Sequence, residues 1–135
     1  MKIVMIIDRD LPNGMLANTA AVLGISVGAM VADVVGPGNL DADGRAHRGI
    51  TQRTIPVLAG TAESIRELRD RLYESEYAAI TVIDFSGVAR NSLNYATYTT
   101  ELAKTPSSEL SYLGICLCGP DKLVNKLTGS MRLLR

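Results

Sequence analysis

Apolar and polar residues follow one another along this chain in blocks, and the apolar blocks come in two kinds. Four of them are short runs rich in Val, Ile and Leu and bounded by polar or turn-forming residues. Short runs of this kind predict strands that are buried on both faces. The predicted strands cover residues 2–7, 54–59, 78–84 and 110–118.

Helical patterns separate these runs. From about residue 15 to residue 35 the chain is apolar, rich in small residues and free of Pro, which predicts a long buried helix. Thr61, with Ser64 three positions later, predicts the N-terminal cap of a second helix. Residues 87–103 predict a third helix, and the stretch after the turn at Gly119 predicts a last, short one.

The segment 36–53 is polar and interrupted by glycines, and it predicts a loop with a tight turn at Asp43 and Gly44. His47, the single histidine of the chain, lies in this loop. It has no second His or Cys at the spacing of metal ligands, so we expect a solvated side chain and no metal site.

Strands that alternate with helices over 135 residues predict one domain, residues 1–135, of the α/β class. We expect three layers, with helices on both faces of a four-stranded, mostly parallel mixed sheet. In such folds ligands gather at the carboxyl ends of the strands.

Charge and hydropathy limit the classes of function. Lysines and arginines number 14 and acidic residues number 14, a balance that argues against a protein that wraps nucleic acid. Asp8 interrupts the first apolar run too early for a signal peptide, and no apolar stretch approaches the 18 or so residues of a spanning helix. We therefore expect a cytoplasmic protein that does not contact a membrane. A mean hydropathy of +0.14 in a short chain predicts exposed apolar surface and a homo-oligomer.

The two cysteines, Cys116 and Cys118, alternate on the last predicted strand, so both side chains point to one face. Two thiols at this spacing form neither a redox CxxC motif nor a zinc site. We expect small, buried core residues.

Charged residues follow two of the predicted strands. Asp8, Arg9 and Asp10 follow the first, and Asp84 ends the third. If these strands are neighbours, the carboxylates gather at one rim, where Asp84 or Asp10 acts as a general base on water. The alternative is that Asp8 or Asp10 caps the next helix while Arg9 pairs with an acid. The residues expected to contact a ligand at this rim are Asp8, Arg9, Asn13, Gly14, Asn18, Ser86 and Gly87.

The two ends of the chain carry a family resemblance. The opening KIVMIIDRDLPNGMLA and the closing GPDKLVNKLTGSMRLL resemble the first strand and helix and the final segment of type 2 peptidyl-tRNA hydrolases. A closer likeness is to a bacterial domain family of unknown function that shares this fold and combines DRDLP-G near the start with YLG, CGP and KLTGS near the end. The resemblance implies the hydrolase fold.

The departures from the hydrolase pattern affect its chemistry. Met15 stands where the resemblance implies the catalytic lysine, Thr19 where it implies Gln, Val22 where it implies His, and Asn125 where it implies an acid. A lost cation that stabilises developing charge commonly lowers a rate by a factor of about a hundred to a thousand.

Two classes of function remain. The first is a ligand-binding or regulatory protein with an unidentified small-molecule ligand and no cofactor. The alternative is a hydrolase of an ester or amide, such as peptidyl-tRNA or aminoacyl-tRNA, that uses Asp84. Met15 and the balanced charge favour the first class, so tRNA binding is not favoured.

Overall fold

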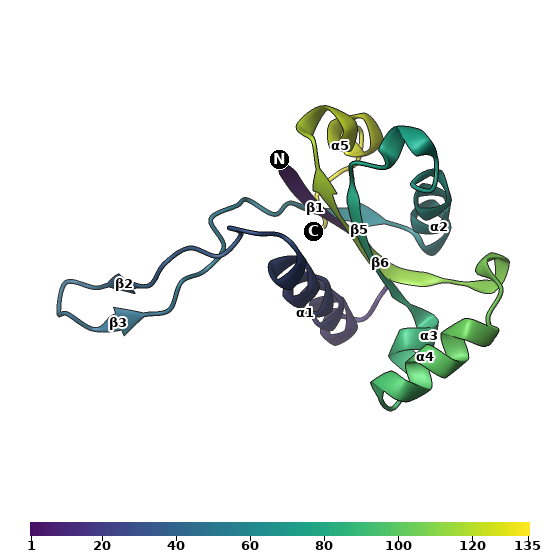
Figure 1. The fold of residues 1–135 in the computed structure, drawn as a ribbon, viewed down its shortest axis with the longest axis horizontal. Coiled ribbons are helices and arrows are strands. Elements are labelled where there is room, and N and C mark those ends of the chain that lie inside the picture. Colours follow the sequence, from purple (N-terminus) through teal and green to yellow (C-terminus); the bar gives the residue numbers. More distant parts are fainter.

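A four-stranded sheet in the order β4-β1-β6-β5 forms the centre of the computed structural model, which describes all residues 1–135 (Figure 1). Each predicted strand is present, with ends that shift by up to three residues. The bounds are β1 Lys2–Asp8, β4 Val57–Gly60, β5 Thr81–Ser86 and β6 Tyr112–Gly119.

The expected mostly parallel sheet is wrong. Only β1 and β4 pair in parallel, whereas β6 is antiparallel to both β1 and β5. The chain leaves β5 and re-enters the sheet from the same end, because the segment between β5 and β6 lies beyond that end and does not cross a face (Figure 1). The sheet is therefore mixed, with one parallel pair.

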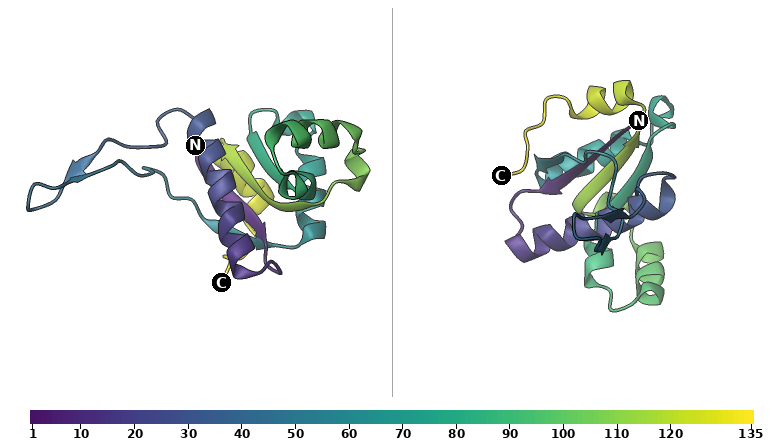
Figure 2. Two further views of the ribbon diagram at one scale, coloured as in Figure 1. Left: turned by 90° about the horizontal axis from the view of Figure 1, so that it is seen from below. Right: turned by 90° about the vertical axis from the view of Figure 1, so that its left-hand side faces the viewer.

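Helices cover both faces of the sheet, as expected, and the three layers are visible in Figures 1 and 2. On one face α2 and α5 pack with β1 and β6 over a core that includes Ile6, Ile115 and Val124. On the other face α1 packs over Ile7 and Cys116. The helix bounds are α1 Asn13–Met30, α2 Ala62–Arg71 and α5 Asp121–Thr128, with a short 3-10 turn η1 at Ser75–Tyr77.

The expected cap of the second helix is confirmed. The Thr61 hydroxyl accepts from the backbone N–H of Ser64 at 3.0 Å, and the Ser64 hydroxyl accepts from the backbone N–H of Thr61 at 2.9 Å. This reciprocal pair satisfies two backbone donors that the first turn of a helix otherwise leaves free.

The third predicted helix is two helices. α3 spans Gly87–Asn91 and α4 spans Tyr95–Lys104, and the 3-10 turn η2 follows at Ser107–Glu109. The side chain of Asn94 accepts from the backbone N–H of Thr97 at 2.9 Å, so a new N-cap begins in the middle of the predicted segment. The sequence prediction of one helix over 87–103 missed this cap.

The predicted loop 36–53 is a β-hairpin that projects from the body, and we call these residues the arm (Figures 1 and 2). Its strands are β2 Asn39–Leu40 and β3 Ala46–His47. The expected tight turn is confirmed, because Gly44 has φ +78° and its N–H donates to the carbonyl of Asp41 at 3.0 Å. Every residue from 37 to 48 is exposed.

Helix α1 begins two residues before and ends five residues before the predicted bounds 15–35. It has 18 residues and a mean hydropathy of 1.2, so it is long and apolar enough to cross a membrane by length and composition. The expectation that no apolar stretch approaches this length is therefore wrong. One side of the helix, with Thr19, Leu23 and Val27, packs on the sheet, but only 17% of its residues are buried, so the expectation of a buried helix holds for that side alone.

The segment after α5 returns to the sheet. The backbone N–H of Ala59 donates to the carbonyl of Arg132 at 2.8 Å, and the N–H of Leu134 donates to the carbonyl of Val57 at 2.9 Å. Leu133 forms an antiparallel bridge with Leu58. The tail therefore covers the outer edge of β4.

Candidate functional site

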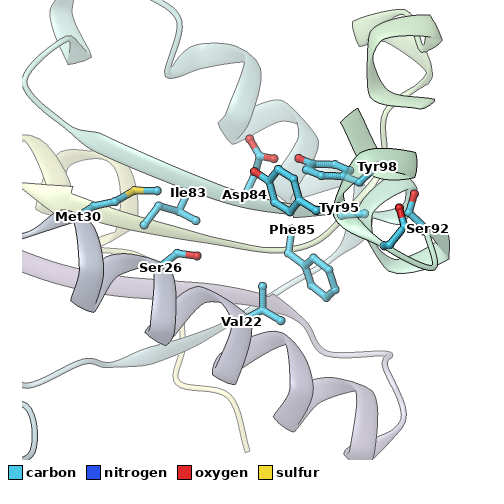
Figure 3. Close-up of a pocket in the computed structure, with 11 residues that line it drawn as sticks. Val22, Ser26, Met30, Ile83, Asp84, Phe85, Ser92, Tyr95 and Tyr98 are labelled. Atoms are coloured by element: carbon cyan, nitrogen blue, oxygen red, sulfur yellow. The ribbon is translucent and has the colours of Figure 1, made fainter. Parts of the chain in front are cut away.

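A cleft of about 440 Å³ lies beside β5, between the second half of α1 and the α3–α4 segment (Figure 3). Ile83 and Phe85 of β5 and Val22 and Met30 of α1 supply an apolar wall. Volumes of this size suit small ligands. The polar groups of the cleft come from Ser26, Asp84, Ser92, Asn94, Tyr95 and Tyr98.

Asp84 is the charged residue of the cleft, and an arginine from the far side of the edge strand pairs with it. Arg69 of α2 donates from Nε to Oδ2 of Asp84 at 2.9 Å, with 14% of the arginine and 25% of the aspartate side chain exposed. The Arg69 guanidinium also lies 4.1 Å from the centre of the Tyr73 ring. Two contacts therefore fix the guanidinium, and Oδ1 of Asp84 has no hydrogen-bond partner within the chain.

Two tyrosines of α4 form the aromatic side of the cleft. The rings of Tyr95 and Tyr98 meet edge to face, with centroids 5.4 Å apart and planes at 81°. Burial raises the pKa of the Tyr98 phenol above its ordinary value, and the Asp84 carboxylate and Tyr95 raise it further. Figure 3 shows both rings close to the Asp84 carboxylate. Tyr98 therefore keeps its proton and remains a hydrogen-bond donor at neutral pH.

Two helix N-caps, at Ser86 and Asn94, determine where Tyr95 and Tyr98 lie. The register of β5 with β6 shifts between Phe85 and Ser86, and the Ser86 hydroxyl then accepts from the backbone N–H of Ala89 at 3.2 Å, so α3 begins at Gly87. Asn94 caps α4 in the same manner. The short α3 turns the chain away from the sheet, and α4 places Tyr95 and Tyr98 of its first turn at the cleft.

Asp84 does not share a rim with the carboxylates that follow β1. Strand β6 lies between β1 and β5, so the condition that these strands are neighbours is not met. Two strand spacings separate them by roughly 10 Å. Oδ1 of Asp8 accepts from the backbone N–H of Asp10 at 3.0 Å, a local turn contact, and Arg9 and Asp10 are exposed. Arg9 forms no ion pair.

The remaining residues of the predicted rim also lie outside the cleft. Asn13, Gly14 and Asn18 are exposed on the first half of α1, whereas the cleft takes residues of the second half. Ser86 and Gly87 adjoin Phe85 of the cleft, but Ser86 is buried and acts as a helix cap. Of the residues expected from the sequence, the cleft contains Asp84 alone.

Sequence reasoning missed Arg69, Tyr95, Tyr98 and Asn94 as site residues. Tyr95 and Tyr98 fitted the apolar side of one long predicted helix, although Ser-Leu-Asn at 92–94 is an N-cap signal that divides it. Arg69 carried no signal, because its partner lies 15 residues away on another element.

The other chemical groups considered in the sequence lie apart from the cleft. Nε2 of His47 lies 2.9 Å from Oδ2 of Asp41 on the exposed arm, and this contact lowers the pKa of Asp41. No three His, Cys, Asp or Glu side chains cluster in a way that could hold a metal ion. Cys116 and Cys118 are buried on one face, as expected, and burial raises the pKa of Cys116 to about 12.

The arrangement can bind and orient a small molecule. Asp84 and Arg69 balance each other in charge, so the cleft offers acceptors, phenol donors and apolar surface without a net charge from this pair.

The comparisons with known proteins agree with the fold. A solved structure of a protein of unknown function, Atu0240 from Agrobacterium tumefaciens strain C58, superimposes with a TM-score of 0.86 at 22% sequence identity, covering 98% of this chain and 96% of that chain. A comparison with curated proteins gives no match. The family described as "Protein of unknown function (DUF2000)" matches residues 1–135. The match fits the likeness of the two chain ends to a domain family of unknown function, and the chain belongs to the DUF2000 family.

Proposed function

We propose that this chain is a cytoplasmic binding protein for a small, uncharged molecule that combines a ring with an amide or hydroxyl group. The observation that carries the proposal is the Asp84–Arg69 pair beside the cleft. Arg69 occupies Oδ2 of Asp84 at 2.9 Å and leaves Oδ1 free to accept a hydrogen bond from a ligand.

The pair selects for an uncharged ligand. A cationic ligand would compete with a guanidinium that the Tyr73 ring already holds at 4.1 Å, and an anionic ligand would meet the Asp84 carboxylate. A neutral N–H or O–H group gains a hydrogen bond to Oδ1 without displacing Arg69. Hydrogen bonds to charged groups contribute about 1.5–3 kcal/mol.

The other side chains that line the cleft favour a ligand that contains a ring. Tyr95 is 80% exposed and stands edge to face with Tyr98, so its own ring presents a large uncovered surface. Phe85 and Met30 add apolar surface on the α1 side of β5, the face opposite the Asp84 carboxylate. Aromatic contacts contribute about 0.5–1.5 kcal/mol beyond the area that they bury.

Binding is favoured over catalysis because the hydroxyls of Ser86 and Ser92 serve the backbone. Ser86 accepts from Ala89, and the Ser92 hydroxyl donates to the carbonyl of Val88 at 2.8 Å. The single histidine lies on the arm with Asp41. No nucleophile with an adjacent base faces the cleft.

The test is a titration of ¹⁵N-labelled protein with N-benzylacetamide, a neutral ring with one amide. We expect resonance shifts confined to the cleft, at Ser26, Asp84 and Tyr98, and binding at least about fivefold weaker in Asp84→Asn and Tyr98→Leu. Asp8→Asn removes a carboxylate outside the cleft and is the matched control.

Two charged probes, benzylammonium and benzoate, complete the titration. Both should bind more weakly than the neutral amide. The proposal is wrong if N-benzylacetamide leaves the cleft resonances unchanged, or if either charged probe binds more tightly.

The alternative is hydrolysis of an ester or amide, such as peptidyl-tRNA or aminoacyl-tRNA, by a chain of the peptidyl-tRNA hydrolase type 2 fold. The free Oδ1 of Asp84 supports it, because this oxygen could orient a water molecule inside the cleft. Cleavage of N-acetylaminoacyl-tRNA that disappears in Asp84→Asn would establish this alternative. Absence of tRNA binding at low salt would exclude it for tRNA substrates, since phosphate contacts are strongest there.

A further inference from the structure

The arm is an ordered element that nothing in its own chain covers. All residues from 37 to 48 are exposed, and Figures 1 and 2 show the hairpin projecting away from the layers. An isolated two-stranded hairpin is marginally stable in water and needs another layer against it. This arm therefore needs a partner surface.

Internal contacts fix the shape of the arm. Asp41 accepts at Oδ1 from the backbone N–H groups of Asp43 and Arg45, both at 3.0 Å, and its Oδ2 lies 2.9 Å from Nε2 of His47. At the base a Cβ on Gly49 would come within 1.8 Å of the carbonyl oxygen of Gly36, so the two strands approach too closely for any side chain there. The sequence thus specifies a shaped projection rather than a variable loop.

Helix α1 also has a surface that nothing in its own chain covers. Its 18 residues include no charged side chain, and only 17% of them are buried. On the face turned away from the sheet, Ile25 is 76% exposed, and Ala21 and Ala29 are exposed beside it. A surface helix normally carries charged residues on this face.

We propose that the chain forms a homodimer in which the arm of each protomer lies along the exposed face of α1 of its partner. A two-fold axis makes the two arm–helix contacts equivalent, so the dimer covers the exposed arm and the exposed face of α1 in both protomers. The apolar arm residues Leu40 and Ile50, 71% and 80% exposed, provide the surface that meets α1.

Length and charge support a second copy as the occupant. Seven residues of extended chain from the base of the arm to its turn span about 23 Å, and a helix of 18 residues is about 27 Å long. The arm thus matches most of the helix. The chain is balanced at 14 basic and 14 acidic residues and α1 is uncharged, so this face offers nothing for nucleic acid or for a charged peptide to recognise.

The first test is the mass of the full chain in sedimentation equilibrium. We expect twice the 14.5 kDa of one chain. Ile25→Glu on α1 and Leu40→Glu on the arm should each weaken the dimer at least about tenfold, because each buries an unpaired charge. Leu93→Glu, at a side chain that is 97% exposed between α3 and α4, is the matched control and should leave the dimer intact.

The second test is a cross-link between protomers. The native thiols are buried, so an Ile25→Cys chain mixed with a Leu40→Cys chain offers one reactive thiol on each. A short bismaleimide should join the two chains in the mixture and neither chain to itself. Circular dichroism of each variant checks that it folds, which we expect because both side chains are exposed within the protomer.

Three results would overturn the proposal. The first is a monomer at about 100 µM. The second is a dimer that both glutamate variants leave unchanged, or a cross-link between two Leu40→Cys chains, which would pair arm with arm. The third is a monomer that co-sediments with phosphatidylcholine vesicles and loses this binding in Ile25→Glu, which would assign the α1 face to a lipid surface.

Discussion

The two edges of the sheet differ in what lies against them. At the β4 edge the tail pairs with the strand through Ala59 and Leu134, so the chain supplies its own cover. At the β5 edge no strand pairs, and the cleft with Asp84 lies there instead. An uncovered strand edge is a hazard that proteins usually block. The β5 edge therefore stays unpaired where the cleft lies.

The largest effect should follow from removing the C-terminal tail that pairs with the outer edge of β4. Removing residues 132–135 deletes two backbone hydrogen bonds and the partly buried Leu134 side chain. We expect a loss of about 3 kcal/mol in the free energy of unfolding, measured by urea denaturation, together with concentration-dependent aggregation. Removing Arg135 alone is the control, because this exposed residue makes no hydrogen bond or ion pair through its side chain. Equal stability of the two truncated chains would show that pairing of the tail with β4 does not stabilise the protein.

An intermediate effect should follow from removing either charge of the Asp84–Arg69 pair at the β5 edge. Asp84→Asn and Arg69→Gln each break a pair whose side chains are 25% and 14% exposed, and each should cost about 1–2 kcal/mol. The double variant should cost less than the two single variants together, because either change alone leaves the other charge unpaired. Asp70→Asn, at an exposed acid without an ion pair, is the control. Strictly additive costs would mean that the pair does not stabilise this edge.

The smallest effect concerns pH. The pKa of Tyr98 is raised in the folded chain by burial and by Asp84, so the folded state holds the phenol proton more tightly than the unfolded state. The stabilisation is present below the ordinary tyrosine pKa of about 10 and is lost as the pH rises through the higher folded value. Burial and Asp84 also raise the pKa of Tyr112, so the ultraviolet titration of Tyr98→Phe is subtracted from that of the wild type to isolate the late-titrating phenol of Tyr98, and Asp84→Asn should bring the Tyr98 pKa closer to 10. Titration of Tyr98 at its ordinary pKa would contradict the cleft geometry.

Local features of the fold could be predicted from the sequence. The capping box of Thr61 and Ser64 and the turn at Asp43 and Gly44 depend on residues within four positions of each other, and both were predicted. The buried strands and the shared face of Cys116 and Cys118 followed from apolar runs and from the two-residue period of a strand.

The direction of β6 and the composition of the cleft could not be predicted in this way. Strand direction depends on whether the connecting segment crosses a face of the sheet, and α3 and α4 remain at one end instead. The predicted rim needed β1 beside β5, and the placement of β6 between them separated Asp8 from Asp84. The pairing of Asp84 with Arg69 is a tertiary contact without a local pattern.

The position of β6 also sets the order in which a newly made chain can complete its sheet. Residues 112–119 leave the ribosome after the other three strands of the sheet, yet β6 is the strand that joins β1 to β5, and all eight of its residues are buried. Until then β1 and β4 can pair, while β5 has no strand beside it. A nascent chain of this protein therefore carries its sheet in two unjoined parts until β6 has been made, and β6 then joins them.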